Sequence, residues 1–413
     1  MRARRDDKTA HLTNTPIGAR ATRPHLSFPR LRVGFGAKVR RSETQRSLGL
    51  CLSHDDALNV QESLRERIST QEIDWITTVD LANQHHVTPA LALGLHRKNL
   101  TSLLPADLTQ YLALLLDLNR RRNRMIRVQA AELITALNAR DIRPLLIKGG
   151  LSLVEEDVDD GLFMMADVDI VLNEGEILRA DTVLRSLGFM TFPKADHPVH
   201  ARTYHRAMSL VTIDLHWHLG SQTCLLSTAA AQEASLPLYR DGMYVAVPCA
   251  THRALLPMLS FSIFEPHFGA GVIPMKGLHD FAATCRRQGD HIDWHEIIDR
   301  FCRQDLRRLA EAWLFMARHM LKARIPSNLA NSSSSRRHLD RCLFQLDHPP
   351  LAQVAHRLSS PAWIFGRFRM DYRYNCGLRG PALQAARLRH AANVLARRCL
   401  PYRGRFDRSA PSQ

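Results

Sequence analysis

The sequence predicts an α+β fold in which a small mixed β-sheet is flanked by N-terminal and C-terminal helical regions. Two observations support this prediction. Between residues 142 and 219, apolar and polar residues alternate in short runs, which is typical of β-strands with one buried face. On both sides of that stretch, apolar residues recur at helical spacing, which is typical of amphipathic helices that pack on a core.

Three aspartates stand out in the predicted strands. Asp167 and Asp169 are two positions apart in the run 167–172, and side chains two apart in a strand project from the same face. Asp214 lies on the polar side of the alternating run 211–219, so it should also leave the apolar core. If these two strands are neighbours in the sheet, the three carboxylates converge beside one another.

A glycine turn precedes these strands. The apolar run 145–147 ends in Lys148, Gly149 and Gly150, and a helix is predicted to start near Leu151. Glycines let backbone N–H groups come close to a phosphate, and the positive end of a following helix attracts one. Converging carboxylates bind Mg²⁺, which prefers hard oxygen ligands and relieves their mutual repulsion. The pattern is typical of a nucleotidyl-transfer site in which two ions about 3.5–4 Å apart hold the attacking and leaving oxygens.

On these motifs the chain resembles the uncharacterised nucleotidyltransferases that have a polymerase-β-like catalytic core. The resemblance covers about residues 48–321 and implies that the predicted small mixed sheet is a nucleotidyltransferase core. It is carried by three core motifs and by shorter matches around them: Lys148-Gly149-Gly150, Asp167-Val168-Asp169, Ile213-Asp214-Leu215-His216-Trp217, the predicted helix 173–189, Ile73-Asp74-Trp75, His279-Asp280 and Ile292-Asp293-Trp294.

The resemblance implies an enzyme that uses Mg²⁺ or Mn²⁺ and moves a nucleoside monophosphate from an NTP, expected to be ATP, to a hydroxyl or phosphate of an acceptor. By analogy Asp167, Asp169 and Asp214 are the catalytic residues and the metal ligands, with Asp214 closest to the attacking hydroxyl. The sequence does not identify the acceptor, which could be a small molecule, a protein or RNA.

Lys148, Gly149 and Gly150 are the residues expected to bind the nucleotide. The family usually places an arginine four residues before the first aspartate, and this chain has Phe163 there. That departure favours a rival hypothesis, in which the core is catalytically silent and binds a nucleotide or a partner protein.

Three residues of the second helical region, Lys276, His279 and Asp280, could face the cleft of the core, although an ordinary surface position is as compatible with the pattern. The acidic stretch 155–160 lacks strand alternation, so it is expected to be exposed or paired with one of the chain's basic ends rather than to bind metal. Likewise, the basic run 120–124 is expected to form a solvated helical face, with phosphate contact as the alternative.

His216 and His218 lie on the same side of their strand as Asp214, which raises a zinc hypothesis. Without a third nitrogen or sulfur ligand nearby, a polar partner to Asp214 is the better interpretation. The segment 363–374 interleaves aromatic residues with arginines; packing on the core is favoured there, followed by single-stranded nucleic acid and then a membrane surface.

Charge is unevenly distributed over the 413 residues, whose formal net charge is +16. Residues 1–50 carry +9 and residues 336–413 carry +11, so the rest sums to −4. Basic ends could contact nucleic acid, because Lys and Arg neutralise phosphates. This is the basis of a second rival hypothesis, an RNA-modifying nucleotidyltransferase.

The expected organisation has five parts: a basic disordered tail (1–48), an N-terminal helical region (49–130), the α/β core (131–222), a helical domain (223–330), and a linker with a basic, aromatic- and Arg-rich helical region (331–413). The eight cysteines form no CxxC pair, and no apolar run reaches the ~18 residues of a membrane-spanning helix. A cytoplasmic protein without a transmembrane segment is therefore expected.

Overall fold

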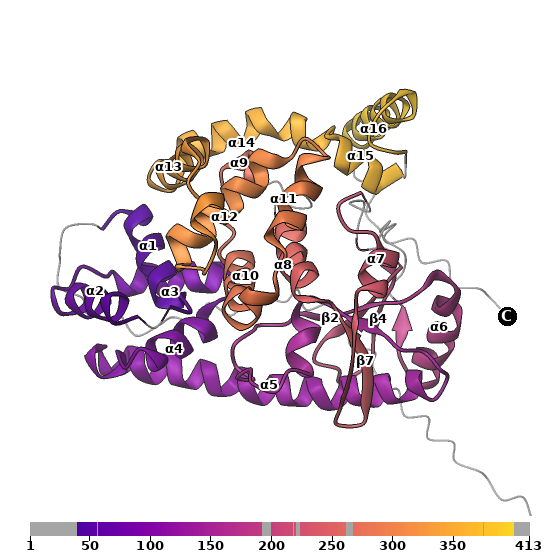
Figure 1. Cartoon of the computed structure of the whole chain (residues 1–413), viewed down its shortest axis with the longest axis horizontal. Helices are drawn as coiled ribbons and strands as arrows, with labels where there is room; N and C mark the ends of the chain where they lie inside the picture. The colour runs from indigo at the N-terminus through magenta and orange to yellow at the C-terminus, as the bar shows by residue number, and fades with distance from the viewer. Residues whose placement is uncertain are drawn as a thin grey trace, which may run out of the picture. The chain divides into compact units, whose positions relative to one another are not determined.

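A computed structural model describes residues 39–55, 57–191, 200–217, 219, 224–261, 267–374 and 376–399. Its strands form one seven-stranded mixed sheet in the order β3-β4-β5-β2-β1-β7-β6 (Figure 1). Their bounds are β1 Leu145–Leu146, β2 Asp167–Val171, β3 Met190–Thr191, β4 His200–His205, β5 Thr212–His216, β6 Leu236–Arg240 and β7 Met243–Val247. The predicted α+β class with a mixed sheet and flanking helices is confirmed.

The helices precede and follow the sheet in sequence. Before it lie α1 Arg41–Leu52, α2 Leu58–Ser69, α3 Trp75–Gln84, α4 Thr88–Arg97 and α5 Ala106–Asn138. Inserted among the strands are α6 Ile177–Ser186 and α7 Thr228–Glu233. After it come α8 Ala250–Leu259, α9 His267–Ala270, α10 Met275–Gln288, α11 Trp294–Cys302, α12 Arg307–Leu321, α13 Ser333–Asp347, α14 Pro349–Ile364, α15 Arg367–Tyr374 and α16 Pro381–Cys399.

The centre of the sheet sets the positions of the predicted acidic residues. Strands β2 and β5 are parallel neighbours, and Asp169 lies directly opposite Asp214 in their register. Strand β1 pairs antiparallel with β2 and parallel with β7. Because side chains of paired positions project to the same face, Asp169 and Asp214 lie side by side.

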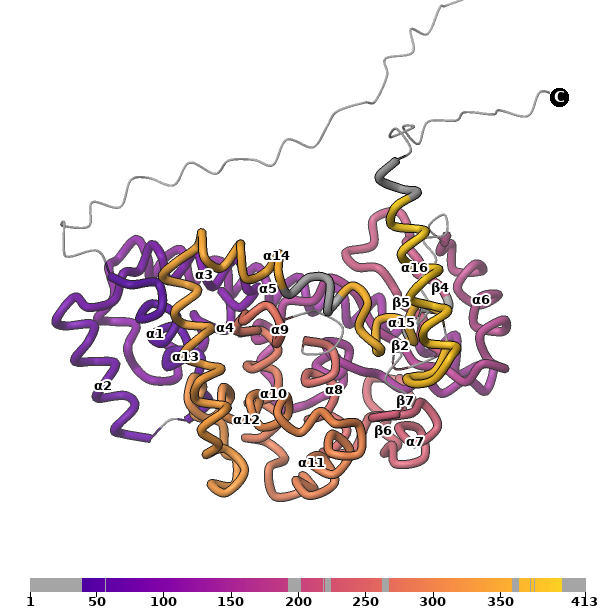
Figure 2. Tube along the Cα trace, turned by 90° about the horizontal axis from the view of Figure 1, so that it is seen from above, coloured from indigo at the N-terminus to yellow at the C-terminus, as the bar shows by residue number. Residues whose placement is uncertain are grey.

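Two hydrophobic clusters form the interior, and helix α5 contributes to both. Its N-terminal half buries Leu108, Leu112 and Leu116 in the cluster of the helical regions. Its C-terminal half buries Ile126 and Leu133 in the cluster beneath the sheet. Figure 1 shows α5 running below both regions, and Figure 2 shows the same from above. Helix α5 therefore packs beneath the sheet with its C-terminal half only.

The predicted basic tail, residues 1–48, overlaps the first helix of the described chain. Residues 1–38 lie outside the described part of the chain, and α1 begins at Arg41. Leu48 and Leu52 are fully buried, and the backbone N–H and hydroxyl of Ser42 both donate to Asp347 near the C-terminal end of α13, at 2.9 and 2.7 Å. Residues close to the predicted boundary thus belong to the helical core.

The predicted helical domain 223–330 also contains two strands. Strands β6 and β7 form a hairpin whose two-residue turn is Asp241-Gly242, with φ of +50° and +78°. Positive φ at both turn positions is the geometry that favours an Asp-Gly pair. The hairpin extends the sheet beyond the predicted core, because β7 pairs with β1.

The C-terminal region packs on itself and on the preceding helices. Ser335, in the predicted serine linker, is buried within α13. Met370 of α15 is fully buried against α16, and Arg367 and Arg379 both pair with Asp305. The contact of Arg367 agrees with the packing interpretation that was favoured for residues 363–374. Among the described residues, no helix is both long and apolar enough to cross a bilayer.

Candidate functional site

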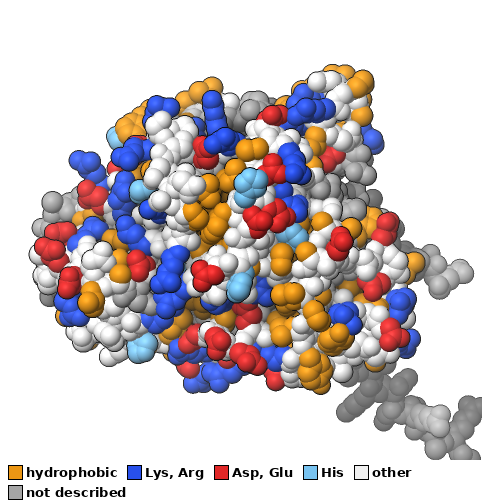
Figure 3. All heavy atoms as spheres, viewed as in Figure 1, with side chains coloured by type: hydrophobic (Ala, Val, Ile, Leu, Met, Phe, Trp, Pro, Cys, Tyr) orange, Lys and Arg blue, Asp and Glu red, His pale blue; other side chains and the backbone are white. Residues whose placement is uncertain are grey.

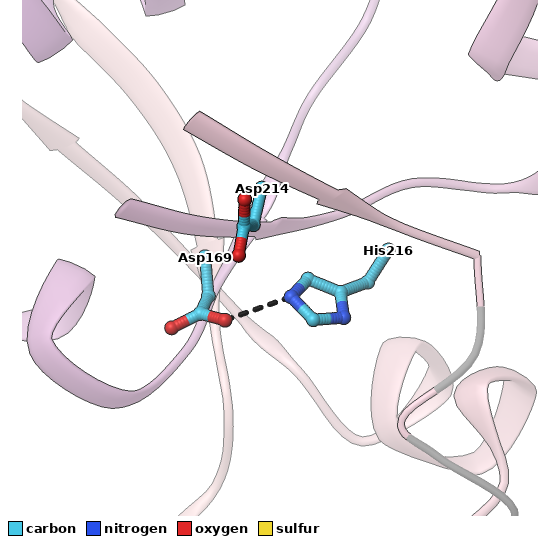
Figure 4. Close-up of side chains that lie close together, drawn as sticks. All are labelled: Asp169, Asp214 and His216. Carbon is cyan, nitrogen blue, oxygen red and sulfur yellow. Dashed lines mark hydrogen bonds and ion pairs between the residues drawn. The ribbon is translucent and has the colours of Figure 1, made fainter. Parts of the chain in front are cut away.

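Three polar side chains meet on the face shared by β2 and β5. The carboxylates of Asp169 and Asp214 and the imidazole of His216 offer ligand atoms that all lie within 4.8 Å of one another. Their exposed fractions are 2%, 6% and 3%. Figure 4 shows the imidazole directed at the Asp169 carboxylate from the neighbouring strand. In the described part of the chain, these three residues form the one group of His, Cys, Asp and Glu side chains that lie close enough together to hold a metal ion.

Asp169 is in contact with two polar side chains. Its Oδ1 atom accepts from the ammonium of Lys148 and lies near Nε2 of His216, each at 2.7 Å. Burial alone would raise the pKa of the Asp169 carboxyl, but Lys148 and His216 more than offset burial and hold that pKa well below its ordinary value. The carboxylate is therefore ionised at neutral pH.

Lys148 reaches this carboxylate from a turn after β1. Its φ is +51°, in the left-handed region, and its side chain is 41% exposed. Burial alone would lower the pKa of the Lys148 ammonium, but the Asp169 carboxylate more than offsets this and raises the pKa above its ordinary value. The ammonium acts as a tethered cation beside two buried carboxylates.

The donor set suits a divalent cation. Carboxylate oxygens are ligands for Mg²⁺ and Mn²⁺, and an imidazole nitrogen suits first-row transition metals. Two buried carboxylates in adjacent strands repel each other, and one ammonium offsets only part of that repulsion. Asp169 and Asp214 could therefore hold an ion, with His216 as a third ligand or as the group that orients Asp169.

A cavity of about 330 Å³ opens beside this group. Its sheet wall includes four of the residues singled out by sequence, namely Lys148, Gly149, Asp167 and Asp169. Asp167 is half-buried and lies outside the group of three ligand atoms. The structure thus brings Asp169 and Asp214 together and places Asp167 on the adjoining cavity wall.

The two glycines are held closely by neighbouring atoms. A Cβ on Gly149 would lie 2.8 Å from Cγ of Met165, a side chain that is 5% exposed. Gly150 is buried, and its N–H donates to the carbonyl of Ile147 at 3.1 Å. The helix predicted to start near Leu151 is a short 3-10 helix, Lys148–Leu153, which begins three residues earlier. Close packing of Met165 explains the small residue at Gly149.

The opposite wall of the cavity comes from helices α8 and α10. Lys276 and Asp280, which the sequence suggested could face the cleft, both line it and form an ion pair at 3.2 Å. Burial alone would raise the pKa of Asp280, but Lys276 and His279 more than offset that effect and lower it. His279 is not among the lining residues; it is 2% exposed, and its ring lies near those of His54 and Phe163.

Two arginines of this wall were not singled out by the sequence. Arg253 of α8 and Arg287 of α10 both line the cavity, and both form ion pairs with Glu155. Arg253 is 8% exposed, and its Nε also donates to the carbonyl of Pro248 at 2.8 Å. Glu155 belongs to the acidic stretch and lies 98 residues before Arg253 and 132 before Arg287, so no local pattern indicates the pairing.

Two further members of the acidic stretch anchor the segment that leads into β2. Asp159 pairs with Arg120, and Asp160 pairs with Arg127, both from α5. The side chain of Asn123 donates to the carbonyl of Phe163 at 2.8 Å. These partners lie in α5 and not in the basic ends of the chain, so the expected pairing with those ends is wrong for Asp159 and Asp160. One partner, Arg120, belongs to the basic run that was expected to form a solvated helical face.

The comparisons with known proteins point to one family. A family model described as "Uncharacterised nucleotidyltransferase" matches residues 71–322, a span that contains the whole sheet, helices α8 and α10 and both walls of the cavity. No curated protein and no solved structure shows detectable similarity to the chain. On the strength of the family match, which covers more than half of its length, the chain belongs to the family of uncharacterised nucleotidyltransferases.

Proposed function

We propose that this protein is a divalent-metal-dependent nucleotidyltransferase that moves a nucleoside monophosphate from an NTP, proposed to be ATP, to an acceptor hydroxyl or phosphate. The observation that carries the proposal is the pair of buried carboxylates Asp169 and Asp214, side by side on parallel strands. Asp169 also lines a cavity whose other wall carries cationic side chains. The family match supports the reaction class.

Each acidic residue has a proposed part in this site. Asp169 and Asp214, together with Asp167 on the cavity wall, would hold Mg²⁺ or Mn²⁺. A bound ion of this kind neutralises phosphate charge and orients the attacking and leaving oxygens. Lys148 would give up its contact with Asp169 when an ion arrives, which would free its ammonium for a phosphate oxygen. His216 would keep the Asp169 carboxylate oriented or complete the ligand set.

The charges of the cavity favour binding of the metal before or together with the nucleotide. Four basic and four acidic side chains line it: Lys148, Arg253, Lys276 and Arg287 against Glu155, Asp167, Asp169 and Asp280. The formal charges of these lining Lys, Arg, Asp and Glu side chains therefore cancel. Each divalent ion adds two positive charges, so the loaded cavity attracts a polyanion such as a nucleoside triphosphate.

A transfer assay with α-³²P-labelled NTPs, Mg²⁺ or Mn²⁺ and candidate acceptors tests the proposal. The wild type should label an acceptor, and the Asp169→Asn/Asp214→Asn double variant should not. Circular dichroism and melting curves of the two proteins serve as the control for folding. Transfer that persists in the double variant would overturn the assignment of these carboxylates.

A nucleotide-binding protein without turnover is the second candidate. Two observations favour it: Lys148 already occupies the Asp169 carboxylate, and Phe163 stands where the family usually has an arginine. Mg²⁺–ATP binding without label transfer to small molecules, protein or RNA would support this candidate. Label that appears only in the presence of an acceptor would exclude it.

RNA as the acceptor has less support. On the face shown in Figure 3, acidic and basic side chains are intermixed. Of the C-terminal arginines, Arg367 and Arg379 are paired with Asp305. RNA binding through a basic surface should weaken steeply with added salt, because each neutralised phosphate releases counterions. Binding that is insensitive to salt would count against RNA.

A further inference from the structure

We propose that the polyphosphate of the nucleotide is held by the helical wall of the cavity, through Lys276 and Arg287 of α10 and Arg253 of α8, rather than by the glycine turn. This inference rests on the proposed function and assigns the phosphate subsite within it. It differs from the expectation drawn from the sequence, which placed the phosphates on Gly149 and Gly150.

The glycine turn has little to offer a phosphate. The N–H of Gly150 already donates to the carbonyl of Ile147 within the turn, and Gly150 itself is buried. Met165 packs against Gly149 closely enough that a Cβ there would clash with it. The segment Lys148–Leu153 is a 3-10 helix of 6 residues, too short to build the dipole of a long α-helix. Backbone donors are therefore a poor anchor for the phosphates in this chain.

Helix α10, in contrast, presents a regular polar stripe to the cavity. Lys276, Asp280, Thr284 and Arg287 all line it, and their spacing of three to four residues puts them on one face of the helix. The two cations stand at the ends of the stripe, with a hydroxyl and a carboxylate between them. Such a row can follow an extended anion along the helix.

Glu155 orients the guanidinium groups at one end of this stripe. It pairs with Arg253 and with Arg287, so one carboxylate serves two cations. A guanidinium has five N–H donors, and a carboxylate shared between two arginines cannot satisfy them all. The arginines therefore keep donors that can reach phosphate oxygens, in the planar arrangement that suits them.

Burial leaves these cations short of solvent. The side chains of Lys276 and Arg287 are each 28% exposed, and that of Arg253 is 8% exposed. Burial lowers the pKa of Arg287 below its ordinary value, which reflects the cost of keeping its charge away from water. A bound polyphosphate would compensate that charge, and it would do so across the cavity from Asp167 and Asp169.

Binding of inorganic tripolyphosphate, measured by calorimetry in the presence of Mg²⁺, tests the inference directly. Lys276→Met and Arg287→Met remove the charge but keep the apolar part of each side chain. In Arg287→Met, Glu155 keeps its ion pair with Arg253. Each should weaken tripolyphosphate binding by about tenfold, because each removes one charge-assisted contact. Lys276→Arg should restore most of the loss. Binding of AMP should change much less than binding of ATP.

Two further variants decide between the walls. Arg303→Met removes an exposed arginine that pairs with Asp299 away from the cavity, and it should leave tripolyphosphate binding unchanged. Gly150→Ala tests the glycine turn; an added Cβ would meet its nearest atom, the Asp169 carbonyl oxygen, at an ordinary 3.6 Å. Loss of binding in Gly150→Ala, unchanged binding in both α10 variants, or no tripolyphosphate binding by the wild type would overturn the inference.

The outcome is separable from that of the proposed function. Tripolyphosphate binding that depends on Lys276 and Arg287, in a protein that transfers no label, supports the subsite and counts against the enzyme. Label transfer that depends on Asp169 but is indifferent to both α10 residues supports the enzyme and overturns the subsite.

Discussion

The two walls of the cavity hold their charges by different means. On the sheet wall, Asp169 and Asp214 are almost fully buried, and strand register sets their separation. On the helical wall, Lys276 and Arg287 keep more than a quarter of their surface exposed and are held by side-chain ion pairs. Backbone hydrogen bonds position a group more rigidly than paired side chains do. The sheet wall therefore suits fixed reaction chemistry, and the helical wall suits binding of the substrate's phosphates.

The largest expected effect lies on the sheet wall. Asp169→Asn should lower the rate of label transfer roughly a thousandfold, because metal-assisted charge neutralisation contributes several kcal/mol. Lys276→Met on the helical wall should instead act mainly on the KM for the NTP. Steady-state kinetics of both variants check this difference. Equal losses of kcat in the two would remove the distinction between the walls.

The free energy of unfolding should depend on pH through two groups, one in the helical regions and one, at lower pH, in the sheet. Burial, with smaller effects of His267 and His86, lowers the pKa of His85 from 6.5 to about 4. Between these values the unfolded chain binds a proton that the folded chain does not. The contribution of His85 to the free energy of unfolding is thus complete above pH 6.5. It is lost at about 1.4 kcal/mol per pH unit as the pH falls to 4.

The sheet should respond only at lower pH. The pKa of Asp169 lies below its ordinary value of 3.8, so its contribution to folding is present above 3.8 and is lost further into acid. Urea unfolding of the wild type and of His85→Gln at pH 7, 6, 5 and 4 tests this order. The variant should lose stability less steeply over that range. Identical slopes would contradict the assignment to His85.

A smaller effect is expected from removing the tethered cation. Lys148→Met should lower the free energy of unfolding in EDTA by about 1–3 kcal/mol, since it removes a charge-assisted hydrogen bond to a buried carboxylate. Added Mn²⁺ should restore stability in this variant, because an ion can take the place of the ammonium beside Asp169. Melting temperatures with and without Mn²⁺ provide the measurement. A variant whose melting ignores Mn²⁺ would argue against a metal at this carboxylate.

The smallest effect is expected on the helical wall. Lys276→Met removes a partly buried i, i+4 ion pair with Asp280, and i, i+4 pairs on helices contribute roughly 0.3–0.5 kcal/mol. Its melting temperature should therefore stay close to that of Arg303→Met, which loses a similar pair. A much larger loss in Lys276→Met would mean that the helical wall is as rigidly built as the sheet wall.

Sequence patterns anticipated the sheet wall better than the helical wall, for a physical reason. Alternation with period 2 assigns a face of the strand to Asp169 and to Asp214. The two side chains then lie close together if the two strands are neighbours, as they are. The hairpin β6–β7 was missed, although its Asp241-Gly242 turn is a recognisable signal. Strand alternation is local information, so a single sequence reveals it.

The missed features depend on contacts between distant segments. Arg253 and Arg287 face the cavity because α8 and α10 pack beside Glu155, and no spacing in the sequence records that meeting. The contact of Lys148 with Asp169 depends on a left-handed backbone at a non-glycine residue, which composition does not indicate. A phosphate subsite made of cations on a helix can be predicted only when the packing of that helix is known.

The continuity of helix α5 has a consequence for how the protein unfolds. It is continuous over 33 residues, which corresponds to about 50 Å, and it supplies apolar side chains to both hydrophobic clusters. Melting one cluster alone would leave half of this helix without its apolar cover, and an isolated helical half is marginal in water. Heating should therefore dismantle the helical regions and the sheet in one cooperative transition, with both walls of the cavity lost together.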